Sequence, residues 1–162
     1  MKIRKLTEAD YKLYKEIRLE SLVKDPNAFG STYEYDSVQA DDYWKSTLNS
    51  YHIFAIFDED KVIGCAGLDT SSMERFKHNA KLWGMYVSEE YRGKGLAFKL
   101  IEELVNYAKN NGITQIHLSC IKENLAAFKF YEKLGFEIYG IMPKAVKIGD
   151  KYCDDCLMIK EI

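Results

Sequence analysis

The segment between residues 79 and 110 constrains the fold of this chain more than any other. It predicts a strand from about Asn79 to Val87, followed by a short loop that contains two glycines. The loop leads into a helix whose apolar residues recur at spacings of three and four and form one stripe: Leu96, Leu100, Ile101, Leu104, Val105 and Ala108. Asn111 and Gly112 end that helix. The chain therefore contains a strand, a glycine loop and an amphipathic helix in direct succession.

The rest of the sequence predicts further elements on both sides of this unit. Strands are predicted at 2–6, 53–57, 62–68 and 113–120, and helices at 7 to 23 or 24, 38–48 and 125–134, with an irregular segment at 29–35. Gly149 and Asp150 have the composition of a two-residue hairpin turn between the last two strands. The order is strand, two helices, three strands, helix, strand, helix and two strands, which is an α/β (α+β) arrangement.

The length and charge of the chain exclude several classes of protein. Its 162 residues fit one domain, residues 1–162, which can bury a core without disulfides or metals. The formal net charge of −2 lacks the basic excess of a nucleic-acid binder. No apolar run approaches about 18 residues, the length of a membrane span, and none follows the basic residues near Met1. We therefore expect a cytoplasmic domain that binds neither membranes nor nucleic acid.

Two of the four cysteines form a C-x-x-C, at Cys153 and Cys156. The segment around them alternates like a strand, so residues three apart point to opposite faces and lie about 10 Å apart. That separation is too large for a disulfide, and no second C-x-x-C or nearby histidine completes a metal site. We interpret both as packing cysteines; the alternative is a zinc or redox pair.

The loop after Val87 has the features of an anion site. Glycines let the backbone approach a ligand, and the free N–H groups of a first helical turn, together with the helix dipole, favour phosphate. Arg92 and Lys94 add positive charge beside Gly93 and Gly95. The loop matches neither a Walker A nor a Rossmann glycine motif. The alternative is an ordinary helix start with two solvated basic residues.

A second motif opens the helix predicted at 125–134. Asn124 is placed to cap it, and Ala127 and Tyr131 lie on one face at positions i and i+4. The small residue at 127 leaves room beside the tyrosine ring. Taken alone, Tyr131 is better explained as a core residue than as a catalyst.

Together the two motifs resemble the signature of the GNAT family of N-acetyltransferases. The first reads Arg92-x-x-Gly95-x-Ala97; the second combines Asn124, Ala127, Tyr131 and Gly135-Phe136. The resemblance covers roughly residues 80–136 in detail, and the flanking element order fits the same fold. It implies a mixed, mostly antiparallel sheet of about seven strands flanked by four helices.

The resemblance also implies a role for each residue of the motifs. It implies acetyl-CoA as cosubstrate, direct attack by a primary amine within a ternary complex, and no metal. Tyr131 would be the catalytic acid that protonates the departing thiolate, and the N–H near Val87 would polarise the thioester carbonyl. The implied cofactor-binding residues are Met85, Tyr86, Val87, Arg92, Gly93, Lys94, Gly95, Leu96, Ala97 and Asn124.

The acceptor amine and its base are not fixed by these motifs. Some family members carry a Glu on the strand before Asn124, where this chain has Ser119. His117 on the same strand face and Glu34 in the segment near the acceptor pocket are candidates, and each has an ordinary structural or solvated explanation. Glu34 would form an acidic rim that favours a cationic amine, together with Asp36, Asp41 and Asp42. The alternative is a solvated helix start whose acidic residues suit the helix dipole. The acceptor is a small molecule, a peptide or a protein N-terminus.

A different class of function fits the same cofactor motifs. A non-catalytic module that senses acyl-CoA through a partner would keep the loop and the strand. Tyr131 favours the enzyme, and the lack of an assigned base is the one point for the sensor. The resemblance further suggests a homodimer.

Overall fold

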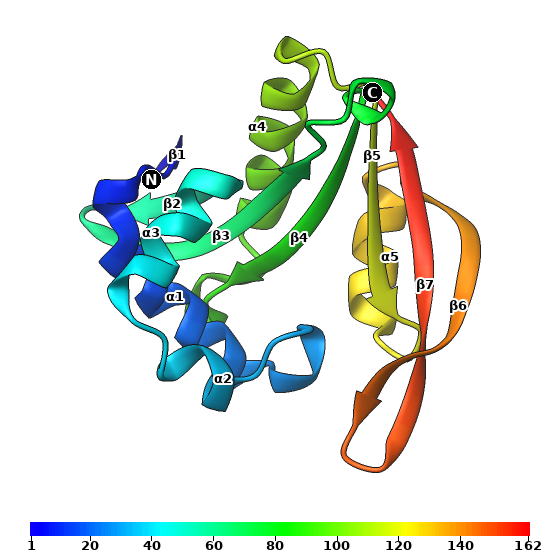
Figure 1. Cartoon of the computed structure of the whole chain (residues 1–162), viewed down its shortest axis with the longest axis horizontal. Coiled ribbons are helices and arrows are strands. Elements are labelled where there is room, and N and C mark those ends of the chain that lie inside the picture. Colours follow the sequence, from blue (N-terminus) through cyan, green and yellow to red (C-terminus); the bar gives the residue numbers. More distant parts are fainter.

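Seven strands form one sheet in the computed structural model, which describes residues 1–162 (Figure 1). Their order is β1-β2-β3-β4-β5-β7-β6, and every neighbouring pair is antiparallel except the parallel pair β4 and β5. The mixed, mostly antiparallel sheet predicted from the resemblance is thus confirmed. The strands are β1 (Lys2–Lys5), β2 (His52–Asp58), β3 (Lys61–Thr70), β4 (Asn79–Val87), β5 (Gln115–Ile121), β6 (Glu137–Ile148) and β7 (Lys151–Glu161).

Five α-helices accompany the sheet, one more than the four predicted. They are α1 (Tyr11–Lys24), α2 (Tyr33–Ser37), α3 (Asp41–Ser50), α4 (Leu96–Asn110) and α5 (Leu125–Lys133). Single 3-10 turns lie at Glu8–Asp10, Pro26–Ala28, Glu74–Phe76 and Glu89–Tyr91. Gly149, at φ +59°, forms the predicted turn between β6 and β7.

The extra helix corrects the prediction of an irregular segment at 29–35. Thr32 caps α2, because its hydroxyl oxygen accepts the N–H of Tyr35 at 3.3 Å. The carboxylate of Asp36 turns inward, where it accepts the hydroxyl of Ser31 at 2.7 Å. The helix predicted at 38–48 begins later, with two acidic residues, Asp41 and Asp42, in its first turn, where they suit the helix dipole.

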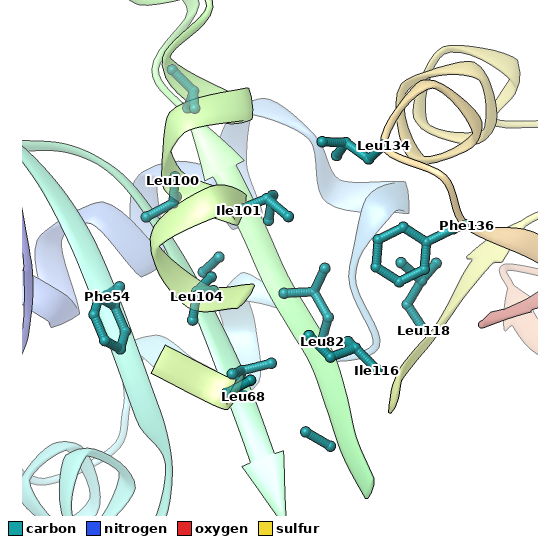
Figure 2. Packing of buried hydrophobic residues seen from close by; sticks show 14 of the residues in the cluster. Phe54, Leu68, Leu82, Leu100, Ile101, Leu104, Ile116, Leu118, Leu134 and Phe136 are labelled. Carbon is teal, nitrogen blue, oxygen red and sulfur yellow. The ribbon is translucent and has the colours of Figure 1, made fainter. Parts of the chain in front are cut away.

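Two apolar cores lie on opposite faces of the sheet. On one face, the stripe of α4 packs on β2, β3, β4 and β5, as Figure 2 shows for Leu100, Ile101 and Leu104 beside Leu68 and Leu82. Leu134 and Phe136, just beyond α5, join this core. On the other face, α1 and α3 pack on β2, β3 and β4 through a second cluster that includes Tyr14, Ile17, Trp44, Leu48 and Tyr86.

The strands β4 and β5 pair only at their N-terminal ends. Their ladder joins Asn79 with Gln115, Ala80 with Ile116 and Lys81 with His117, and it stops there. Figure 1 shows the two strands close together at their first residues and apart at their last. Beyond Lys81, β4 therefore has a strand neighbour on the β3 side alone. We call residues 82–87 the open β4 edge.

A bulge in β4 lies within this open edge. Gly67 pairs with Trp83 and Cys65 with Tyr86, so Gly84 and Met85 together oppose the single residue Ala66. Gly84 has φ +64°, a left-handed conformation that strains any residue with a Cβ. The bulge thus depends on a glycine at position 84.

The four cysteines are free thiols. Cys153 and Cys156 are both buried within β7, which agrees with their interpretation as packing residues. Cys156 lies directly opposite Cys120 of β5, and Cys153 lies opposite Val146 of β6.

None of the five α-helices is both long enough and apolar enough to cross a membrane.

Candidate active site

The open β4 edge directs a backbone donor away from the sheet at Val87. The next residue, Ser88, donates its N–H to Ile63 of β3 at 2.9 Å. Because backbone groups alternate between the two sides of a strand, the N–H and C=O of Val87 point to the side of β5. The carbonyl confirms this direction, since it accepts Nε of Arg92 at 2.8 Å. The N–H of Val87 has no strand partner there, because the ladder with β5 ended at Lys81.

The loop that follows ends in a row of unpaired backbone donors. The first intrahelical bond of α4 joins the N–H of Lys99 to the carbonyl of Gly95 at 3.2 Å. None of the N–H groups of residues 93–98 donates to a backbone acceptor, and no side chain caps the helix. Gly93 and Gly95 have φ of +75° and +73°, and no atom lies within 4 Å of a Cβ built on either. The chain thus presents free donors and open space at a helix N-terminus, the arrangement that binds phosphate groups.

The two basic side chains of this loop turn back onto the protein. Arg92 Nη2 donates to the Asp25 carboxylate at 2.6 Å, and the guanidinium lies 5.4 Å from the centre of the Tyr86 ring. Lys94 Nζ donates to the carbonyl of Glu90 at 3.0 Å. The backbone donors, rather than these side chains, therefore face the open space beside the loop in this conformation.

Residues of the β4 edge and the α4 start hold the loop in place. Tyr86 and Ser88 both donate to the carboxylate of Glu20 on α1, at 3.0 Å and 2.6 Å. Leu96 is buried in the core beneath α4, and Met85 and Ala97 pack against that core. Glu20 was not identified from the sequence as a residue that contacts this region. A single glutamate in a helix such as α1 gives no other indication of this role.

The second motif lies at the start of α5, just after β5, on the far side of the gap between β4 and β5. The side-chain oxygen of Asn124 accepts the N–H of Ala127 at 3.2 Å, so the predicted cap is present, and its amide NH₂ has no protein partner. Tyr131 is half-buried against the α4 core, with its ring edge-on to Phe130 and Phe136. Its hydroxyl makes no hydrogen bond with a protein atom. Burial, with a smaller effect of a Cys120 thiolate, raises the pKa of Tyr131 well above the ordinary value.

A cavity of about 580 Å³ opens on the face of the sheet that α1 and α3 cover. Its walls come from α1, α3, the segment before and within α2, and strands β3 and β4. Four charged side chains line it, Arg18, Asp36, Asp69 and Lys81. Its aromatic lining residues are Tyr14, Tyr43, Trp44, Tyr51 and Trp83.

The predicted substrate residues lie in three different places. Glu34 is exposed on α2, while Asp36 of the expected acidic rim is buried and faces Arg18 at 3.5 Å. Ser119 is exposed on β5. His117 is half-buried opposite Lys81, and burial, followed by the positive charge of Lys81, lowers its pKa. None of Glu34, His117 and Ser119 lines the cavity.

Comparison with known proteins identifies relatives of one kind. The model of the acetyltransferase (GNAT) family matches residues 14–136. The N-acetyltransferase YobR of Bacillus subtilis is 47% identical over 55 residues, which are 34% of this chain and 22% of that protein. N-alpha-acetyltransferase 30 of Schizosaccharomyces pombe is 32% identical over 83 residues, 51% of this chain and 55% of its own. The L-amino acid N-acyltransferase MnaT of Escherichia coli is 28% identical over 107 residues, 65% and 60% of the two chains. The chain thus spans less than two thirds of each relative.

Solved structures share the fold along nearly the whole chain. An acetyltransferase of the GNAT family from Streptococcus pneumoniae has a TM-score of 0.87 and 23% identity, with 99% of both chains covered. YncA of Salmonella typhimurium, solved with its cofactor acetyl-CoA, has a TM-score of 0.84 and 22% identity, covering 99% of this chain and 93% of its own. The matched residues include the open β4 edge, the glycine loop and α5, and on this match the chain belongs to the GNAT acetyltransferase family.

Proposed function

We propose that the protein is an acetyl-CoA-dependent N-acetyltransferase that acetylates a primary amine by direct attack within a ternary complex. One observation carries the proposal. The strand that presents the free N–H of Val87 is followed directly by the loop and helix start that carry the free N–H groups of residues 93–98. Acetyl-CoA has a thioester carbonyl at one end of its pantetheine arm and a pyrophosphate at the other end of that arm, and it supplies the activated acetyl group.

The residues present fit the cosubstrate along its length. The donors of residues 93–98 would bind the pyrophosphate, and the backbone of Met85, Tyr86 and Val87 would bind the pantetheine arm as a further strand would. The free amide of Asn124 would donate to the same arm from the side of α5. Each of these groups is a donor or edge that the fold leaves without a partner.

The N–H of Val87 would stabilise the negative charge that develops on the thioester oxygen. Removing one donor of this kind from an enzyme typically costs about 10²–10³ in rate. The direction of this N–H is fixed, because its neighbour Ser88 is bonded to β3 and its own carbonyl is held by Arg92.

Tyr131 would give its proton to the departing thiolate. Its raised pKa keeps the hydroxyl protonated throughout the neutral and mildly alkaline range. In the balanced reaction, the amine nitrogen forms a bond to the acetyl carbon, the C–S bond breaks, the amine loses a proton and the thiolate gains one. General acid catalysis is typically worth about 10²–10⁴ in rate. No metal takes part in the proposed reaction.

The proton of the attacking amine requires a separate acceptor. The lowered pKa of His117 leaves its imidazole neutral, and so able to accept a proton, near pH 7. Because His117 is outside the cavity lining, a water molecule would have to connect it with the amine. Glu34, Ser119 and a homodimer remain predictions that the fold does not test.

The test is amine-dependent release of CoA, detected as free thiol, with acetyl-CoA and a panel of amines. The panel contains amino acids, polyamines, aminoglycosides and peptides with free N-termini. Turnover with at least one class is expected. Saturable binding of acetyl-CoA without turnover by any amine would refute the enzyme and support a module that senses acyl-CoA.

A further inference from the structure

Three buried donors around the α1–α3 cavity have no acceptor. They are Nη1 of Arg18 and the indole nitrogens of Trp44 and Trp83. Arg18 is 7% exposed and Trp44 is 1% exposed, so neither group is hydrated by bulk solvent. A buried polar group without a partner destabilises the folded state, and more so if it is charged. All three residues line the same cavity.

Arg18 is the most exceptional of the three. Its Nε lies 3.5 Å from the Asp36 carboxylate and its guanidinium lies 4.8 Å from the centre of the Phe29 ring, yet it donates no hydrogen bond to any protein atom. The Asp36 carboxylate instead accepts the hydroxyl of Ser31. Since a guanidinium has five N–H donors in a planar fork, the site keeps a buried cation whose hydrogen-bonding capacity is unused.

The chemistry of the unpaired groups restricts what the cavity can bind. All of them are donors, so they require hydrogen-bond acceptors, and the cation among them favours an anion such as a carboxylate. A polyamine offers only donors and would leave the three groups unpaired. The four charged lining residues are two cations and two anions, Arg18, Lys81, Asp36 and Asp69, so the cavity suits a ligand that also carries both charges.

The position of Arg18 connects the cavity to the reacting end of the open β4 edge. Nη1 lies 3.9 Å from the place where a Cβ on Gly84 would be. Gly84 belongs to the bulge immediately before Met85, Tyr86 and Val87. A carboxylate held at Nη1 is therefore next to the strand segment that would polarise the thioester.

We propose that this cavity is the acceptor site and that it selects α-amino acids, whose carboxylate accepts hydrogen bonds from Arg18 and from the indole N–H of Trp83. The inference rests on the proposed acetyltransferase function and names its substrate class. The aromatic walls, with Tyr51 edge-on to Trp83 at 4.9 Å, favour a sizeable apolar side chain on that amino acid.

The experiment compares three amines that share one side chain. L-Phenylalanine carries the carboxylate, L-phenylalaninamide replaces it with a neutral amide, and phenethylamine lacks it; the leucine series repeats the comparison. We expect kcat/KM for the acid to exceed that of the other two by at least about 100-fold, as for sites built around a buried polar contact. An amine beside an amide has an ordinary pKa near 8, so more of it is neutral than in the amino acid, and basicity cannot produce the preference for the acid over the amide. Equal or better turnover of the amide or of phenethylamine overturns the inference and leaves the acetyltransferase standing.

Two variants locate the preference in the cavity. Arg18→Lys keeps the charge but removes the fork, and it should raise KM for L-phenylalanine at least about tenfold while KM for acetyl-CoA stays unchanged. Arg4→Lys is the matched control, because Arg4 also pairs with an aspartate, Asp10, and stacks on an aromatic ring, that of Phe57, outside the cavity. If Arg18→Lys does not fold, Trp83→Phe removes only the indole N–H and should raise the same KM several-fold. A KM for the acid that is unchanged in both Arg18→Lys and Trp83→Phe refutes the assignment.

Direct binding separates this inference from the proposed function. Calorimetric titration of the protein saturated with CoA should show saturable binding of L-phenylalanine and none of L-phenylalaninamide at the same concentrations. Acid-selective binding without turnover by any amine would reject the acetyltransferase and retain the carboxylate site. If the protein neither binds nor acetylates the acid but acetylates another amine, the carboxylate site is rejected and the acetyltransferase is retained.

Discussion

Gly95→Ala separates the backbone strain of the glycine loop from its role in binding. Gly95 has φ +73°, and no atom lies within 4 Å of a Cβ built there, so the substitution causes no clash. The left-handed conformation costs a residue with a Cβ about 1–2 kcal/mol. In a domain of this size, that loss corresponds to a fall in Tm of about 2–8 °C.

Gly112→Ala is a control with the same strain at the other end of α4. Gly112 has φ +77° and also has no atom within 4 Å of a built Cβ. The two variants should therefore lose similar stability. Only the methyl group at position 95 would stand in front of the free donors of residues 93–98, where the pyrophosphate is proposed to bind.

Differential scanning calorimetry gives the Tm, and calorimetric titration with CoA gives the Kd. We expect Gly95→Ala to raise the Kd for CoA at least about tenfold, or about 1.4 kcal/mol, and Gly112→Ala to leave it within twofold of the native value. A Kd close to the native value in both variants would show that the loop does not hold the cosubstrate. A Kd raised in both would attribute the effect to loss of stability.

Three other substitutions or conditions test the site and the fold. Tyr131→Phe should lower kcat by about 10²–10⁴ with little change in Tm, because the hydroxyl has no protein partner; a kcat within threefold of native would remove it from the mechanism. Gly64→Ala should destabilise the protein by about 1–3 kcal/mol in urea unfolding, since its Cβ would lie 2.9 Å from the carbonyl oxygen of Tyr86, and an unchanged midpoint would contradict this packing. Burial, and to a smaller degree the nearby lysines, lowers the pKa of both His52 and His117 in the folded protein. As the pH drops below about 6.5, the unfolded chain therefore binds protons before the folded one, and the free energy of unfolding should fall. A urea midpoint constant between pH 7 and pH 5 would argue against neutral histidines in the folded state.

The elements with strong local signals were predictable from the sequence. The stripe of α4 sits on the core as its spacing of three and four required, and the turn at Gly149 and Asp150 joins β6 and β7. The segment 29–35 was mispredicted, because α2 depends on the cap at Thr32 and on the contact of Asp36 with Arg18, a partner in α1. A five-residue helix has too few apolar residues for its periodicity to be visible.

The cavity was not predicted, because its residues come from distant parts of the chain. Arg18 lies in α1 and Trp83 in β4, and no local pattern joins them. A signal was nevertheless present in α1, whose buried residues are Tyr14, Ile17, Arg18, Ser21 and Leu22. An arginine within the apolar stripe of a helix must find a buried partner, since a cation in the core is costly.

The role of Arg92 also depended on tertiary structure. From the sequence, the positive charge of Arg92 was expected to contribute to a phosphate site. In the structure, its guanidinium lies between the carbonyl of Val87 and the carboxylate of Asp25. Asp25 precedes Arg92 by 67 residues, so this pair has no local signature. The Arg92 side chain therefore contacts the end of β4, and the backbone donors of the loop face the open space.

The location of Val87 between two cores explains how one strand can present a fixed donor. The side chain of Val87 is buried in the core beneath α4, while that of Tyr86 is buried in the core beneath α1. The flanking hydroxyls of Tyr86 and Ser88 share the Glu20 carboxylate, so a residue on α1 holds both neighbours of Val87. A donor held this way needs no reorganisation when charge develops beside it, which is the condition for large electrostatic stabilisation. These contacts on both faces of β4 thus make the open β4 edge rigid rather than frayed at Val87.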